Sequence, residues 1–95
     1  MASFIVRVEL VDSREEEYEF LDAEMEKRGF SKSLPNAEGE WFIMPTGEYF
    51  YQGHKTVGYI CAMGEQAADT INRKARILAA EIVMVAFDLD PQKKA

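Results

Sequence analysis

The first residues of the chain alternate between apolar and polar side chains. Val6 and Val8 lie on one side of an extended chain, and Arg7 and Glu9 lie on the other. A period of two is typical of a strand with one buried face. We therefore expect a first strand over 4–11, with Arg7 on its solvent-facing side.

The following segment has the spacing of an amphipathic helix. Ser13 and Glu16 fit the Ser-x-x-Glu pattern of a capping box, which marks a helix start. Gly29 suits the left-handed residue that ends many helices. The apolar residues that recur at helical intervals between these signals are Tyr18, Leu21 and Met25. The pattern predicts a helix that ends near Gly29.

Two short strands are predicted over 30–34 and 41–44, because a segment rich in turn formers separates them. We expect them to form a β-hairpin. The segment 47–62 favours extended structure and predicts a further strand or small hairpin. A helix that begins near Val57 is the competing interpretation.

The last third of the chain predicts one more helix and one more strand. A helix is expected over 65–80 from an apolar stripe, and Asp69 and Arg73 have the i,i+4 spacing of an ion pair. The stripe consists of Ala67, Ile71, Ala75 and Leu78. A continuous apolar run predicts a central strand over 82–87, and 88–95 is expected to be a frayed tail.

The predicted order of elements is β-α-β-β-α-β, which is that of a ferredoxin-like fold. We expect one α+β domain over 1–95, in which two helices pack on one face of an antiparallel sheet. Ninety-five residues with 47% hydrophobic side chains can bury one core without metal or disulfide support.

Composition narrows the range of partners. The net charge of −6 disfavours broad binding of nucleic acid and fits a domain that binds basic partners or imitates the charge of nucleic acid. The single cysteine, Cys61, excludes an intrachain disulfide, and its apolar neighbours predict a buried, inert thiol. The chain has no signal-peptide pattern and no long apolar run, so we expect a cytoplasmic protein with no membrane partner.

Residues with potential chemistry are few, and each has a simpler structural explanation. His54 titrates near neutral pH in its unperturbed form, yet in a Gly-His-Lys turn it is also typical of an ordinary surface histidine. Asp12 ends the first strand, so in a dimer two such carboxylates could hold Mg²⁺ between them. A capping role for Asp12 or Ser13 is the simpler explanation of that position. No other cofactor and no protein metal cluster is expected.

Three groups of side chains are candidate binding surfaces. Exposed aromatics on the open face of the sheet would stack on RNA or form a homodimer contact, but aromatic residues also fill cores. A basic stripe on the second helix would follow a phosphate backbone or simply balance the acids. Glu15 and Glu16 would face a basic partner or only solvent. The aromatic candidates are Trp41, Tyr49 and Tyr51, and the basic ones are Arg73 and Arg76.

Three segments resemble a known group of small bacterial and prophage proteins. They are 4–10 (FIVRVEL), 18–31 (YEFLDAEMEKRGFS) and 45–49 (PTGEY), and they are similar to the GhoS-type antitoxins. The resemblance covers about the first half of the chain. It implies a ferredoxin-like fold related to small CRISPR-associated ribonucleases.

The resemblance also implies an activity, namely cleavage of a toxin messenger RNA by a sequence-selective endoribonuclease. Arg7 and Arg73 would then stabilise phosphate charge, and His54 or Asp12 would handle a proton or a metal. The alternative is a non-enzymatic phage or prophage protein, an acidic inhibitor of a host defence complex that acts by binding protein or by imitating nucleic acid. No phosphate loop, triad or paired-cysteine motif decides between these hypotheses.

Overall fold

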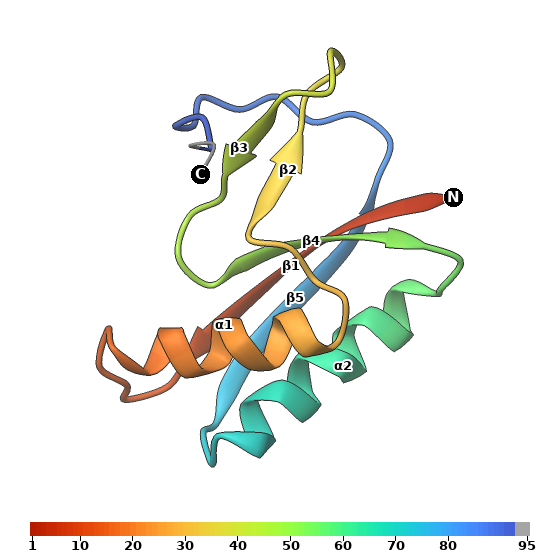
Figure 1. Ribbon diagram of the computed structural model, residues 1–95. Coiled ribbons are helices and arrows are strands. Elements are labelled where there is room, and N and C mark those ends of the chain that lie inside the picture. The colour runs from red at the N-terminus through yellow and green to blue at the C-terminus, as the bar shows by residue number, and fades with distance from the viewer. Residues whose placement is uncertain (93–95) are drawn as a thin grey trace.

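The computed structural model describes residues 1–92 and contains two helices and five strands arranged as antiparallel sheets (Figure 1). The predicted α+β class is therefore confirmed. The elements, in chain order, are β1 (Ala2–Leu10), α1 (Glu17–Lys27), β2 (Ser33–Pro35), β3 (Trp41–Ile43), β4 (Glu48–Gly53), α2 (Val57–Thr70) and β5 (Ala75–Ile82).

The main sheet is built around the first strand. β1 pairs antiparallel with β4 on one side and with β5 on the other, so the strand order is β4-β1-β5. The predicted alternation along β1 is confirmed, because Val6 and Val8 are buried while Arg7 and Glu9 are exposed. Both helices lie on the same face of this sheet (Figure 1). Leu21 of α1 and Ile60 of α2 join Val6 and Val8 in one core.

Helix α1 begins with a cap that is shifted from the predicted one. Glu16 is the N-cap residue, but its side chain makes no capping hydrogen bond. The backbone N–H of Arg14 instead donates to a carboxylate oxygen of Glu17 at 3.0 Å, and the Ser13 hydroxyl donates to the carbonyl of Leu10. The predicted capping box of Ser13 and Glu16 is therefore wrong. The equivalent pair lies one residue later, at Arg14 and Glu17, because the Ser13 hydroxyl is bonded to the end of β1 instead. Gly29 follows the helix with φ +90°, as expected.

Helix α2 corrects the assignment of the second half of the chain. It starts after Thr56, whose hydroxyl accepts a hydrogen bond from the N–H of Tyr59, and it ends at Thr70. The competing prediction of a helix from Val57 is therefore right, and the helix over 65–80 is wrong beyond Thr70. Residues 75–82 form β5 because pairing with β1 satisfies their backbone groups, and 83–87 is not a strand.

The hairpin of β2 and β3 is confirmed, but it forms a second, two-stranded sheet. Residues 88–92 are not a frayed tail, because the N–H of Ile43 donates to the carbonyl of Asp90 and the N–H of Gln92 donates to that of Trp41. Residues 93–95 of the predicted tail lie outside the described residues. A second apolar cluster joins this hairpin and the C-terminal segment to the face of the sheet opposite the helices. Its buried members are Leu34, Met44 and Phe50.

Candidate functional site

The three residues predicted to act in catalysis are spread from one end of the main sheet to the other. Arg7 is exposed near the middle of β1, on the face away from the helices. Asp12 follows the C-terminal end of β1 in a left-handed conformation (φ +52°) and is exposed. His54 follows β4, whose last residue Gly53 pairs with Ala2 at the other end of β1.

These positions do not form one site within a chain. β1 has nine residues, and a strand rises about 3.3 Å per residue, so its ends are roughly 26 Å apart. His54 and Asp12 therefore lie too far apart to act on the same bond. Among residues 1–92, no group of three or more His, Cys, Asp and Glu side chains is placed to hold a metal ion.

The aromatic candidates belong largely to the core. Tyr49 is fully buried, so its side chain is not available to a partner. Tyr51 is half-buried and its ring lies 5.1 Å from that of Phe30. Trp41 on β3 is 43% exposed and meets the ring of Phe50 edge-on. Only Trp41 of the three presents substantial surface, because the helical side of β4 faces the core.

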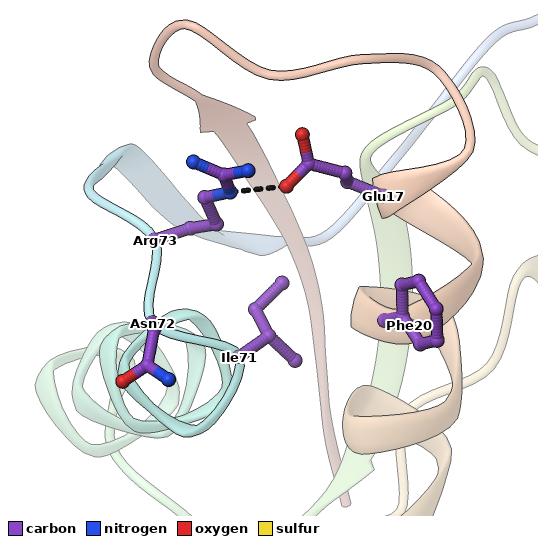
Figure 2. Close-up of a pocket in the computed structure, with 5 residues that line it drawn as sticks. All are labelled: Glu17, Phe20, Ile71, Asn72 and Arg73. Atoms are coloured by element: carbon purple, nitrogen blue, oxygen red, sulfur yellow. Dashed lines mark hydrogen bonds and ion pairs between the residues drawn. The ribbon is translucent and has the colours of Figure 1, made fainter.

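The basic candidates do not form a helical stripe. Arg73 lies in the turn after α2, and its Nε donates to a carboxylate oxygen of Glu17 (Figure 2). Arg76 lies on β5 and contacts Glu9 at 3.0 Å. The predicted Asp69–Arg73 pair is therefore replaced by a contact to α1. Each arginine has part of its charge offset within the protein, which weakens its attraction for phosphate.

The Glu17–Arg73 pair closes one side of a shallow pocket between α1 and the turn after α2 (Figure 2). Its volume is about 480 Å³, and Phe20 and Ile71 supply its apolar lining. The pKa of Glu17 is lowered, first by the hydrogen bond from the Arg14 backbone N–H and then by the Arg73 guanidinium. Figure 2 shows Asn72 directed away from the Glu17–Arg73 contact.

A second polar cluster lies between α1 and the sheet and had no local signal in the sequence. The hydroxyl of Tyr49 donates to Oδ1 of Asp22 at 2.6 Å, and Nζ of Lys32 contacts Oδ2 at 2.9 Å. Burial, followed by the hydrogen bond to Asp22, raises the pKa of Tyr49 well above its usual value. The three residues join α1, the segment before β2 and β4.

The outer side of α1 is the most distinctive charged surface. Phe20 is 65% exposed, although aromatic side chains of this size are usually at least half covered. Glu16 lies one helical turn before Phe20 and Glu19 directly before it, and both are exposed, as is Glu15 just before the helix. None of these three glutamates makes an ion pair among residues 1–92. We call Glu15, Glu16, Glu19 and Phe20 the acidic face of α1.

Most basic side chains near the acidic face are already paired elsewhere. Lys27 and Arg28 both contact Glu24, at 2.8 and 3.0 Å. These contacts lower the pKa of Glu24, the hydrogen bond from Lys27 contributing most. Lys32 and Arg73 are also paired. Arg14, beside Glu15, is exposed and makes no ion pair among residues 1–92, so it offsets part of the charge, and the three glutamates of the acidic face leave a net negative charge.

Comparison of the chain with models of known protein families, with curated proteins and with solved structures finds no match. The similarity to GhoS-type antitoxins therefore stays a prediction. None of the helices within residues 1–92 is long and apolar enough to cross a membrane.

Proposed function

We propose that this protein is a non-catalytic binding protein whose acidic face of α1 docks on a basic surface of a protein partner. The observation that carries the proposal is the position of Phe20, which is 65% exposed beside Glu16 and Glu19, two glutamates that have no ion pair among the described residues. Buried aromatic anchors supply much of the energy of protein interfaces, and complementary charge speeds and orients the encounter.

The distribution of charge supports a protein partner over nucleic acid. The free charge on α1 is negative, while Arg28, Arg73 and Arg76 all contact carboxylates of the same chain. A surface of this kind attracts a basic partner and repels phosphate. It fits the hypothesis of an inhibitor that occupies the basic surface of a host defence complex.

The experiment separates this face from the rest of the acidic surface. One variant combines Glu15→Gln, Glu16→Gln and Glu19→Gln, and a second carries Phe20→Ala. The control removes the same charge from exposed positions elsewhere, by Glu38→Gln, Glu65→Gln and Asp69→Asn. Tagged wild-type protein is used to capture a partner from a lysate of the source cells, and affinities are then measured with the purified partner.

We expect the triple variant and Phe20→Ala each to weaken binding by about tenfold or more, equivalent to about 1.4 kcal/mol. Binding of the wild type should also weaken with added salt, because exposed charges are screened. The control triple variant should bind like the wild type. Equal affinity of all four proteins would overturn the proposal.

A second candidate is the endoribonuclease activity that the GhoS-type resemblance implies, on a ferredoxin-like βαββαβ domain with β3 added. The antiparallel order β4-β1-β5 and the isolated bridge from Ser31 to Phe50 support that fold. Arg7 supports contact with RNA, since it is exposed beside Leu78 on the face of the sheet opposite the helices and has no ion pair among residues 1–92.

The test of the second candidate is incubation with a mixed RNA pool, with and without Mg²⁺. Discrete cleavage that is lost in Arg7→Ala, His54→Ala or Asp12→Ala would support it. Dependence on Mg²⁺ together with Asp12 would favour a metal held by two copies of the chain. Intact RNA under every condition would overturn it and leave the acidic binding protein.

A further inference from the structure

The strand β5 forms an edge of the main sheet. It pairs with β1 in a continuous register from Leu10–Ala75 to Ser3–Ile82, and no other described strand lies along its second side. Edge strands of natural proteins are normally blunted by charged side chains, proline, a bulge or a short length. β5 has eight residues, is not interrupted by a bulge and contains no proline, and its only charged residues, Arg76 and Glu81, lie near its two ends.

The same edge carries exposed apolar side chains. Leu78 is 70% exposed on the face of the sheet away from the helices. Val83 and Met84, which follow the strand directly, are 96% and 90% exposed. Exposed apolar side chains beside unpaired backbone groups are typical of a surface that adds a strand from another chain.

We propose that this edge is the homodimer interface, in which β5 pairs antiparallel with β5 of a second copy about a two-fold axis at Ala79. Residues opposite each other in such a pair point to the same face, so Leu78 would lie against the small Ala80 of the partner subunit. Because of the two-fold axis, the same contact occurs twice in the dimer. The result is a continuous sheet with three strands from each copy, in which neither copy keeps an open β5 edge.

Charge selects a second copy as the occupant. The chain carries a net charge of −6, so most approaches between two copies are repulsive. β5 carries one positive and one negative side chain, Arg76 and Glu81, and is therefore neutral. The edge is where two molecules of this protein meet with little repulsion. A strongly basic partner would instead be drawn to the acidic face of α1, which this pairing leaves open.

The first test measures molar mass by sedimentation over a range of concentrations. The wild type should approach twice the chain mass of 10.8 kDa as concentration rises. Leu78→Lys should raise the dimer dissociation constant at least about tenfold, because two like charges would then lie near the axis. Val83→Lys, outside the strand, should also raise the dimer dissociation constant. It replaces Leu78→Lys as the test if that variant does not fold. The matched control is Val57→Lys on α2, also exposed and apolar, which should not change the constant.

The second test locates the axis. Ala79→Cys in a Cys61→Ser background should form an intermolecular disulfide under mild oxidation, because paired Cα atoms on the axis lie within about 5.5 Å. Glu65→Cys on α2 in the same background should not. The inference would be overturned if the measured mass stayed that of a monomer at all concentrations up to about 1 mM. Any dimer with a dissociation constant tighter than that would be detected over this range. A dimer unaffected by both lysines, or lacking the Ala79→Cys disulfide, would overturn this pairing.

Discussion

The hydroxyl of Tyr49 on β4 donates a hydrogen bond of 2.6 Å to Oδ1 of Asp22 on α1. The ring of Tyr49 is fully buried against the sheet, whereas Asp22 lies at the margin of the helix and also contacts Lys32. This contact joins residues 27 positions apart in the chain. It ties α1 directly to β4, beside the core contacts of Leu21 and Met25.

Replacement of Tyr49 by phenylalanine should reduce stability without changing the fold. The ring stays buried, but the hydrogen bond to a charged carboxylate is lost, at a cost of about 1.5–3 kcal/mol. The free energy of unfolding from urea titrations measures the loss. Tyr51→Phe is the control, because the Tyr51 side chain makes no hydrogen bond among residues 1–92. Equal losses in both variants would contradict a specific role for the Tyr49–Asp22 bond.

The same pair predicts how stability responds to alkaline pH. The pKa of Tyr49 is raised in the folded protein, so the folded state holds this proton more tightly than the unfolded chain does. The stability that results from this difference in pKa is fully present below the unfolded pKa of about 10 and is lost progressively as pH rises above that value. Between neutral pH and pH values above about 10, the free energy of unfolding should therefore fall less in Tyr49→Phe than in the wild type. Urea titrations followed by circular dichroism at each pH measure this difference.

Tyrosinate absorbance gives an independent reading of this behaviour. Because its pKa is raised, Tyr49, one of four tyrosines, should ionise only when the chain unfolds. Reversible ionisation of all four before any loss of structure would contradict the predicted shift.

The sequence predicted the first half of the fold better than the second, for reasons that particular residues make clear. Val6 and Val8 alternate with charged residues, so period two is unmistakable there. In β5 the outward-facing Leu78 and Ala80 are apolar as well, so alternation is hidden. Ala75 and Leu78 also continue the helical spacing of Ala67 and Ile71, so the segment resembles part of a helix. Residues 75–82 form a strand because they pair with β1, which is distant in sequence.

The candidate sites were less predictable than the fold. Glu15 and Glu16 are exposed as expected, but exposure of Phe20 depends on how α1 rotates over the sheet. Tyr49 was a plausible surface aromatic until the register of β4 with β1 placed it on the helical face. Such outcomes depend on contacts between distant segments, which local patterns do not encode.

The start of α2 offers a test of local capping. The Thr56 hydroxyl accepts from the N–H of Tyr59 at 3.2 Å, and no acidic side chain supports this first turn. Thr56→Ala should lower the free energy of unfolding by about 1 kcal/mol, while Thr56→Ser should retain most of the stability. Thermal unfolding by circular dichroism compares the three proteins. Equal stability of the alanine and serine variants would show that the hydroxyl does not cap α2.

Two glycines with the same backbone conformation allow the effect of close packing to be separated from that of backbone strain. Gly47 and Gly39 both have φ +82°. A Cβ atom at Gly47 would lie 2.7 Å from the carbonyl oxygen of Val8 and 3.2 Å from the ring of Tyr18, whereas one at Gly39 meets nothing within 4 Å. Gly39→Ala should therefore cost only the left-handed strain, about 1–2 kcal/mol.

Gly47→Ala should cost clearly more than Gly39→Ala. The carbonyl oxygen of Val8 is backbone in the central strand and cannot move aside like a flexible side chain. The N–H of Val8 also donates to the carbonyl of Gly47 at 2.7 Å, so the clash weakens a bond that holds this turn to β1. We expect a loss of at least about 3 kcal/mol for Gly47→Ala, because overpacking adds to the strain. Urea titrations that give equal losses for both alanine variants would contradict the tight contact between this turn and the central strand.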